Sequence, residues 1–297
     1  MSERSDLLIT ADDLAAALTA TAGSRPAERA VRVLDVRYAG VGLPSARGDY
    51  VAGHVPSAVY VDLDTELARV GDPKEGRHPL PPLDALQADA RRWGIDDGDL
   101  VVVYDDQSNL YSARAWWLLR YAGVRDVRML DGGLSAWVAA GHPLEQGEVV
   151  ASPGSVSLGY GHLRALSLEQ AGRFPTTGTL LDARAAARYR GETEPIDPRA
   201  GHIPGALSTP TTQNVDADGR FLDAGALRQR FLAAGVDPQH PVATYCGSGV
   251  TAAHNAAALM LAGFEPALFP GSWSQWSQHA DLPVATGDEA PRVLPRE

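Results

Sequence analysis

The only cysteine in this 297-residue chain, Cys246, lies in the segment VATYCGSGVTAAHNAAALMLAGF. The apolar run at 242–245 predicts a short buried strand, and the alanine-rich run at 252–262 predicts a helix that stops at Gly263. The connecting loop, CGSGVT, contains two glycines and no proline, so its backbone amides are free to curl around one atom. Those amides and the helix N-terminus favour a thiolate, and Cys246 is therefore a candidate nucleophile.

An isolated cysteine is also common in protein cores, so a purely structural Cys246 is the alternative. A single cysteine excludes an intrachain disulfide and a multi-cysteine zinc site. The scattered histidines show no metal-ligand spacing. We therefore predict neither a metal nor another cofactor.

The composition, 44% hydrophobic and 21% charged, is that of a soluble globular protein long enough for two domains. The net charge of −11 argues against a nucleic-acid partner or an anionic membrane surface, since both attract positive charge. An anion site in such a chain depends on local arginines and backbone amides. The N-terminus lacks a basic segment followed by an apolar stretch, so we expect a cytoplasmic protein with no membrane segment.

Four short motifs occur twice along the chain in the same order. LDVR, GHVPSA, VVVY and GGLSAW in the first half recur as LDAR, GHIPGA, VATY and GSWSQW in the second half. The spacing between the copies shrinks slightly from the first motif to the last. Such self-similarity indicates a duplicated domain with small insertions in the first copy.

Short apolar runs alternate with helical patterns in each copy. In the first copy, runs at 31–36, 100–104 and 127–130 predict strands, and patterns at 14–20, 83–93 and 113–121 predict helices. This alternation predicts an α/β fold in which each copy is a mostly parallel sheet flanked by helices. We place the first domain at 1–143, a linker containing Gly, Ser and Pro at 144–161, and the second domain at 162–297.

The two copies differ at the position of the cysteine. Aligning Tyr104 with Tyr245 places Asp105 opposite Cys246. A loop that gathers amide groups suits a carboxylate, but a carboxylate is no sulfur nucleophile, so we predict that the first domain is catalytically silent. We expect it instead to shape a cleft that both domains line.

His54 and His202 occupy equal positions in the repeated GH(V/I)PxA motifs. Because one of them belongs to the copy without the cysteine, a structural hydrogen-bonding role is favoured over catalysis. The same reasoning applies to the repeated Asp-x-Arg motifs, which we expect to tie strand ends to neighbouring loops.

The paired DxR and GH(V/I)PxA motifs, the strand-Cys-loop-helix segment and the GxxxxW motifs resemble the tandem rhodanese sulfurtransferases over nearly the whole chain. The resemblance implies two rhodanese-like domains and an enzyme in which Cys246 takes sulfur from a small-molecule donor as a persulfide. The sulfur would then pass to a thiol, to a thioredoxin or to cyanide. A nucleophile used in this way splits one transfer into two easier steps.

The cysteine loop separates two branches of this family. CGSGVT resembles the loop of the 3-mercaptopyruvate sulfurtransferases, which release pyruvate, whereas thiosulfate sulfurtransferases typically carry basic residues after the cysteine. Thiosulfate is a dianion that benefits from nearby cations, and Gly247 and Ser248 supply no charge. We therefore expect 3-mercaptopyruvate as the donor, with thiosulfate:cyanide sulfurtransferase activity as the alternative.

The resemblance also implies a set of site residues. Ser248, His78 in RHPLP and Asp64 in VDLD would act as a relay that polarises the substrate ketone or manages its proton. The loop residues expected to bind the substrate are Gly247, Gly249, Val250 and Thr251.

Two arginines are implied to hold the substrate carboxylate, a role suited to the bidentate guanidinium. Arg188, in DARAAARYRG, matches the first of them. The second normally follows a Glu-Pro pair, but in this chain that pair is followed by Ile196. We expect Arg199 to reach the pocket from its shifted position.

Two other classes of protein fit parts of the pattern. Tyrosine phosphatases also place a cysteine in a loop before a helix, but they carry an arginine six positions later, where this chain has Ala252. A non-catalytic docking module is the second alternative, since the first copy shows that the architecture can lose its nucleophile.

Overall fold

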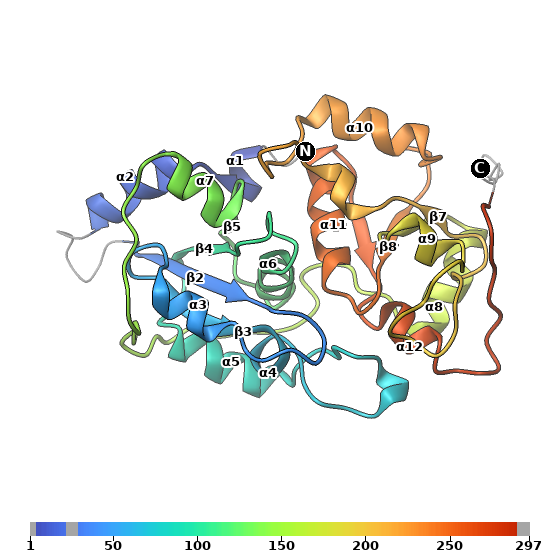
Figure 1. The fold of residues 1–297 in the computed structure, drawn as a ribbon, viewed down its shortest axis with the longest axis horizontal. Coiled ribbons are helices and arrows are strands. Elements are labelled where there is room, and N and C mark those ends of the chain that lie inside the picture. Colours follow the sequence, from blue (N-terminus) through green and yellow to red (C-terminus); the bar gives the residue numbers. More distant parts are fainter. Residues whose placement is uncertain (1–3, 22–28, 290–297) are drawn as a thin grey trace.

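A computed structural model describes residues 4–21 and 29–289 and shows two α/β domains, one from each half of the chain (Figure 1). Each domain is built around one sheet, and all the paired strands within each sheet are parallel. Helices cover the sheets, so the central strands read as continuous apolar runs. The predicted fold class is confirmed.

The sheet of the first domain has five strands in the order β1-β5-β4-β2-β3. Its strands are β1 (Leu8–Ile9), β2 (Val31–Arg37), β3 (Val59–Asp62), β4 (Leu100–Tyr104) and β5 (Val127–Leu130). Its helices are α1 (Arg4–Leu7), α2 (Ala11–Thr21), α3 (Arg47–Ala52), α4 (Leu63–Glu66), η1 (Pro73–Glu75), α5 (Leu83–Arg92), α6 (Ser112–Tyr121) and α7 (Gly133–Ala139).

The sheet of the second domain has four strands in the order β7-β6-β8-β9. Its strands are β6 (Thr179–Asp182), β7 (Leu207–Ser208), β8 (Val242–Tyr245) and β9 (Pro266–Leu268). Its helices are α8 (Leu168–Arg173), η2 (Phe174–Thr176), α9 (Ala186–Tyr189), η3 (Thr211–Asn214), α10 (Ala224–Ala233), α11 (Thr251–Leu261) and α12 (Ser272–Trp276). Strand β8 therefore delivers the cysteine loop at the centre of this sheet, and α11 follows it.

The connection between the domains is an extended segment that hydrogen-bonds to the first domain. The amide of Gly154 donates to the carbonyl of Arg91 at 2.7 Å, and the amide of Val156 donates to the carbonyl of Ile95 at 3.1 Å. These contacts satisfy the linker backbone without a sheet of its own. The linker predicted from its Gly, Ser and Pro content thus runs across the protein surface.

The repeated Asp-x-Arg motifs form the same contacts in both domains. Arg37 pairs with Asp35 and donates to the carbonyl of Gly53 at 2.9 Å. In the second domain, Arg184 pairs with its own aspartate and donates to the carbonyl of Gly201 at 2.6 Å. Each motif therefore ties the end of a strand to the following GH(V/I)PxA turn, as expected from their presence in both copies.

The histidines of the two GH(V/I)PxA motifs are buried and also make equivalent contacts. Nδ1 of His54 lies 2.9 Å from the carbonyl oxygen of Tyr50, and Nδ1 of His202 lies 2.8 Å from that of Tyr189. Each imidazole stacks on the ring of the same tyrosine. Both histidines therefore have structural contacts, in agreement with the sequence argument.

One of the apolar core clusters spans both domains. Helices α6 and α11 lie side by side at the domain boundary (Figure 1), and one cluster of buried residues includes side chains of both. Continuous packing of this kind makes the interface resist sliding. This packing holds the loop that precedes α11 against the first domain. Among the described residues, no helix has the length and apolar character needed to cross a membrane.

Candidate active site

Cys246 begins the loop between β8 and α11 and lies on the wall of a cavity of about 390 Å³. Only 1% of its surface is exposed, yet it lines this cavity together with side chains from both domains. The first domain contributes Tyr38, His78 and Tyr111, and the second contributes Arg188. The expected shared cleft is therefore present, and Cys246 faces it although it also packs against the core.

The backbone around Cys246 is held by close contacts. The amide of Gly249 donates to Sγ at 3.2 Å, and the amide of Trp273 donates to the Cys246 carbonyl at 3.0 Å. Gly249 has a φ of +77°, and a Cβ there would lie 2.2 Å from the Pro270 carbonyl oxygen, so only glycine fits. The sequence predicted several amides around the sulfur, and the structure shows one amide hydrogen-bonded to it.

The loop residues expected to bind substrate fall into two groups. Gly247, Val250 and Thr251 line the cavity. Gly249 does not line it and instead supplies its amide to the sulfur. The loop thus offers backbone and small side chains to a ligand, with no charge of its own.

Ser248, His78 and Asp64 form a continuous hydrogen-bonded chain across the domain boundary. Oγ of Ser248 lies 2.8 Å from Nδ1 of His78, and Nε2 of His78 lies 3.0 Å from Oδ1 of Asp64. A carboxylate only accepts hydrogen bonds, so Nε2–H donates to Asp64 and Nδ1 is left to accept from the serine hydroxyl. The structure brings together the three residues that the resemblance singled out.

Burial and nearby cations govern the charge of His78. Burial lowers the pKa of His78 below its ordinary value of 6.5, the hydrogen bond that His78 donates to Asp64 opposes this, and the positive charges of Arg114 and Arg77 lower it further. His78 is therefore neutral at pH 7 and can accept a proton from Ser248. The direction of this shift agrees with the neutral imidazole that the assigned hydrogen bonds require.

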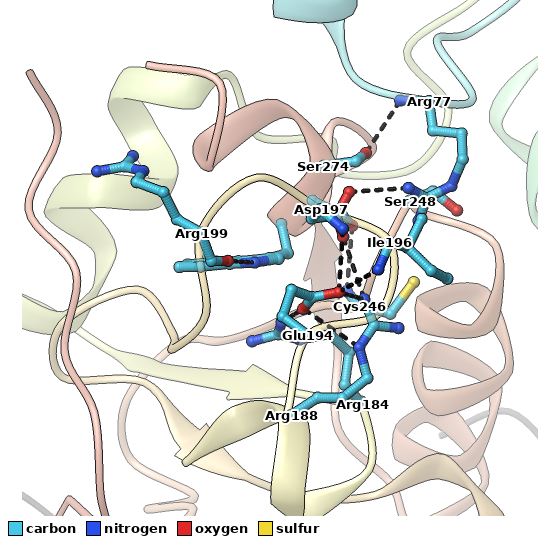
Figure 2. A network of polar contacts seen from close by, with 12 residues as sticks. Arg77, Arg184, Arg188, Glu194, Ile196, Asp197, Arg199, Cys246, Ser248 and Ser274 are labelled. Atoms are coloured by element: carbon cyan, nitrogen blue, oxygen red, sulfur yellow. Dashed lines mark hydrogen bonds and ion pairs between the residues drawn. The ribbon is translucent and has the colours of Figure 1, made fainter. Parts of the chain in front are cut away.

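Arg188 and Arg77 lie on the cavity wall and share one carboxylate. Nη1 of Arg77 is 2.8 Å from Oδ1 of Asp197, and Nη2 of Arg188 is 3.1 Å from Oδ2 of the same residue. Figure 2 shows Asp197 above the cluster formed by Arg188 and Glu194, on the side of Arg77. Sequence reasoning missed Arg77, although its place directly before His78 in RHPLP was a signal that it would reach the same cavity.

Arg199 is not brought to the cavity, contrary to expectation. Its guanidinium donates to four backbone carbonyls around the end of α12, and Figure 2 shows it pointing away from Cys246. The carbonyls at the C-terminal end of a helix attract a cation, and here they use the donors of Arg199. The four accepting residues are Trp276, Ser277, His279 and Leu282.

Arg114 is a buried cation behind the cysteine loop that sequence reasoning also missed. It belongs to α6 of the first domain, and its guanidinium donates to the carbonyls of Gly249 at 3.2 Å and His78 at 3.1 Å. Within the described residues no carboxylate lies within ion-pair distance of it. Burial lowers the pKa of Arg114 to about 10, while the negative charge of Cys246 opposes that shift. An arginine inside the apolar segment SARAWWLL was the available signal.

Asp105 occupies the equivalent loop of the first domain and does not line the cavity. It is fully buried, and its carboxylate accepts four backbone amides at 2.7–2.8 Å. Burial raises the pKa of its carboxyl group, and the four amide donors act in the opposite direction. The loop therefore does bind an anion, but that anion is its own side chain.

The cavity combines a thiol, a neutral proton relay and three arginines, Arg77, Arg184 and Arg188. These groups supply a nucleophile, a donor for a developing oxyanion and countercharges for an acid group. Among the described residues, no group of three or more His, Cys, Asp or Glu side chains is placed to hold a metal ion.

Known proteins resemble the chain over nearly its whole length. Residues 15–140 and 167–279 each match the rhodanese-like domain family. A putative thiosulfate sulfurtransferase, SseB of Mycobacterium tuberculosis, is 44% identical over 97% of the chain and 99% of its own length. A probable 3-mercaptopyruvate sulfurtransferase of Pseudomonas aeruginosa is 45% identical over 95% and 98%. The crystal structure of SseA, a 3-mercaptopyruvate sulfotransferase from Escherichia coli, is 31% identical with a TM-score of 0.77, covering 90% of the chain and 98% of SseA.

Proposed function

Because the chain belongs to the rhodanese family and is a sulfurtransferase of the 3-mercaptopyruvate or thiosulfate type, we propose that its sulfur donor is 3-mercaptopyruvate. The sulfur passes through a persulfide on Cys246 to a thiol acceptor, such as a thioredoxin, or to cyanide. The observation that carries this proposal is the Ser248-His78-Asp64 relay beside the cysteine, since a relay serves a ketone. Thiosulfate has no carbonyl group that would use it.

In the first half-reaction, the Cys246 thiolate attacks the sulfur atom of 3-mercaptopyruvate. A sulfur–sulfur bond forms, the carbon–sulfur bond breaks, and its electron pair enters the departing pyruvate enolate. Ser248 donates its hydrogen bond to the ketone oxygen, where negative charge develops, and His78 takes up or returns the proton through Nδ1. Protonation of the enolate carbon then gives pyruvate.

In the second half-reaction, the acceptor attacks the outer sulfur of the persulfide. The sulfur–sulfur bond to Cys246 breaks, and its electron pair returns to the enzyme thiolate. The Gly249 amide at 3.2 Å from Sγ stabilises that thiolate in both halves of the cycle. The enzyme thus returns to its starting state without a redox cofactor.

Arg77 and Arg188 supply the countercharge for the substrate carboxylate. Both side chains line the cavity that contains Cys246, one from each domain. Guanidinium groups bind carboxylates through paired hydrogen bonds and fix the orientation of the substrate. Arg77 therefore takes the role that the sequence assigned to Arg199.

The proposal is tested by measuring kcat/KM for 3-mercaptopyruvate and for thiosulfate on one preparation. We expect 3-mercaptopyruvate to be preferred by at least about tenfold, since one lost interaction of about 1.4 kcal/mol has that effect. Intact mass measurement after donor addition should show the mass of one extra sulfur atom on the wild-type protein and none on Cys246→Ser. A preference for thiosulfate would overturn the choice of donor.

Thiosulfate is the second candidate because the Mycobacterium tuberculosis relative is named a putative thiosulfate sulfurtransferase. Arg77 and Arg188 also suit a sulfonate group. The same kinetic comparison separates the two donors. A docking module without catalysis would show no persulfide with either donor.

A further inference from the structure

Three arginines and three carboxylates are in contact along one side of the cavity. They are Arg77, Arg184 and Arg188, and Asp182, Glu194 and Asp197. The side chains of Glu194 and Asp197 are only 4% and 3% exposed, so water screens them poorly. The positive charges that face the substrate are therefore balanced by carboxylates directly behind them.

Asp197 is the carboxylate that contacts cavity-lining arginines of both domains. Its two oxygens accept from Arg77 of the first domain at 2.8 Å and from Arg188 of the second domain at 3.1 Å. Glu194 binds only the second-domain arginines, with its shortest contact 2.6 Å from Arg188. Asp197 thus lies where the charges of both domains meet (Figure 2).

The segment that carries Asp197 is fixed at both ends. Oε1 of Glu194 accepts the amides of Ile196 at 3.2 Å and of Asp197 at 3.1 Å. Two residues after Asp197, Arg199 is anchored by its four carbonyl contacts. The charge of Asp197 is therefore held in one place, unlike a mobile surface carboxylate.

Fixed charges of this kind act more strongly on a dianion than on a monoanion. A carboxylate about 6 Å from the ligand, in surroundings between a protein surface and bulk water, weakens binding about tenfold for each negative charge on the ligand. Mercaptopyruvate carries one such charge and thiosulfate carries two. A balanced set of arginines and carboxylates can therefore accept the first and still disfavour the second.

We propose that Asp197, supported by Glu194, is a specificity-determining residue that makes the cavity select singly charged donors over dianions. This inference rests on the proposed function and extends it, because it adds a charge filter to the uncharged cysteine loop. In the sequence, the position after the Glu-Pro pair carries Ile196 in place of the arginine that the family resemblance implies, followed directly by Asp197. Ile196 therefore supplies no cation at this position, and the neighbouring Asp197 adds a negative charge beside it.

The test compares donor selectivity in wild type, Asp197→Asn and Asp218→Asn. Asp197→Asn keeps the size of the side chain and one accepting oxygen but removes its charge. Asp218 is an exposed carboxylate that does not line the cavity, so its variant controls for the change in net charge. We expect the ratio of kcat/KM for thiosulfate to that for 3-mercaptopyruvate to rise about tenfold in Asp197→Asn and to stay within twofold in the control.

A binding assay tests the same filter without turnover. Sulfate, a dianion, and pyruvate, a monoanion, should protect Cys246 from alkylation by iodoacetamide. In Asp197→Asn the protection constant of sulfate should tighten about tenfold more than that of pyruvate, and Glu194→Gln should shift it in the same direction by less. Far-UV circular dichroism establishes that each variant is folded.

The outcomes separate the two proposals. If the wild type uses neither donor, the proposed function fails, while the protection assay still decides whether Asp197 selects by charge. If Asp197→Asn changes thiosulfate and 3-mercaptopyruvate use equally, and sulfate and pyruvate protection equally, the charge filter is overturned. A folded Glu194→Gln variant with a shifted ratio would support the filter even if Asp197→Asn were unstable.

Discussion

The two loops that follow β4 and β8 share a scaffold and differ in what fills it. In the first domain the Asp105 carbonyl accepts the amide of Leu134 at 2.9 Å, and in the second the Cys246 carbonyl accepts the amide of Trp273 at 3.0 Å. The Asp105 carboxylate accepts four amides of its own loop, whereas the sulfur of Cys246 accepts only that of Gly249. The two loops therefore share a backbone arrangement, but the Asp105 carboxylate has four amide donors and the Cys246 sulfur has one.

The Asp105 carboxylate and the Cys246 sulfur also differ in their access to the cavity. Asp105 has no contact with the cavity, and its oxygens have no room for another partner. Cys246 lines the cavity, and its sulfur accepts one hydrogen bond, from the amide of Gly249. Under the proposed function, the loop of the first domain stabilises the structure and the loop of the second domain carries the nucleophile.

The largest effect is expected from moving the nucleophile between the two loops. Cys246→Ser should lower turnover of 3-mercaptopyruvate by about 10⁴-fold or more, because the sulfur that forms the persulfide is lost. Adding Asp105→Cys to that variant should restore nothing, because position 105 is buried away from the relay. Turnover is measured by pyruvate release, and intact mass reports on the persulfide.

Recovery of activity in the double variant would contradict the division of labour between the loops. The single variant Asp105→Cys with Cys246 intact serves as the control for folding. Its persulfide should form at one cysteine only, and peptide mapping identifies which one.

The next effect concerns the loop of Asp105, whose carboxylate accepts four backbone amides. Asp105→Asn should destabilise the protein by about 3 kcal/mol, because the side-chain NH2 group of asparagine replaces one oxygen and cannot accept the two backbone amides that this oxygen binds. Urea unfolding followed by tryptophan fluorescence measures the change. The matched variant Asp218→Asn, on an exposed turn, should change the free energy of unfolding by less than about 0.5 kcal/mol. A neutral Asp105→Asn would show that the four hydrogen bonds do not hold the loop.

The strands and the helix that carry the two loops could be predicted from the sequence. The runs at 100–104, 127–130 and 242–245 are strands at those positions, and the helix expected at 252–262 is observed at Thr251–Leu261. Buried parallel strands and long helices leave clear periodic patterns. The edge strands β1 and β7 contain two residues each and are too short to leave one.

The site could be predicted only in part, because contacts across the chain decide it. Ser248 and His78 are 170 positions apart, and their pairing came from the family resemblance rather than from any spacing. Arg199 was expected at the cavity and Arg77 was not, but the structure places Arg77 there and binds Arg199 to four carbonyls elsewhere. The path of the loop that decides this is a tertiary property. The contacts of Arg114 could not be predicted, because its guanidinium donates to carbonyls of both domains, those of Gly249 and His78.

The next effect concerns the relay of Ser248, His78 and Asp64, which only the loop of Cys246 has. Ser248→Ala should lower kcat/KM for 3-mercaptopyruvate by about a hundredfold, because the ketone loses its proton donor. Thiosulfate turnover, which has no ketone, should change less than threefold. Loss of both activities to the same extent would mean that Ser248 shapes the loop instead of assisting the ketone.

A smaller effect is expected from Arg114, the buried cation of the first domain that contacts the Cys246 loop. Arg114→Met should slow alkylation of Cys246 by iodoacetamide at pH 7 by about tenfold, because a buried cation near the thiolate is removed. Arg114→Lys, which keeps the charge but not the carbonyl contacts, should recover part of the rate. If Met and Lys slow alkylation equally in folded protein, the role of Arg114 is packing alone.

The smallest effect concerns the pH dependence of the relay. An ordinary histidine would be half protonated at pH 6.5, but burial and the neighbouring arginines lower the pKa of His78, so the neutral form persists there and is lost only at lower pH. The ratio of kcat/KM for 3-mercaptopyruvate to that for thiosulfate cancels the pH effects that are common to both donors. That ratio should change less than twofold between pH 7.5 and 6.5 and fall below that range, because protonated Nδ1 cannot accept from Ser248. A ratio that halves at or above pH 6.5 would mean that His78 titrates as a solvated imidazole, and the relay would then lack the buried environment that distinguishes its loop from that of Asp105.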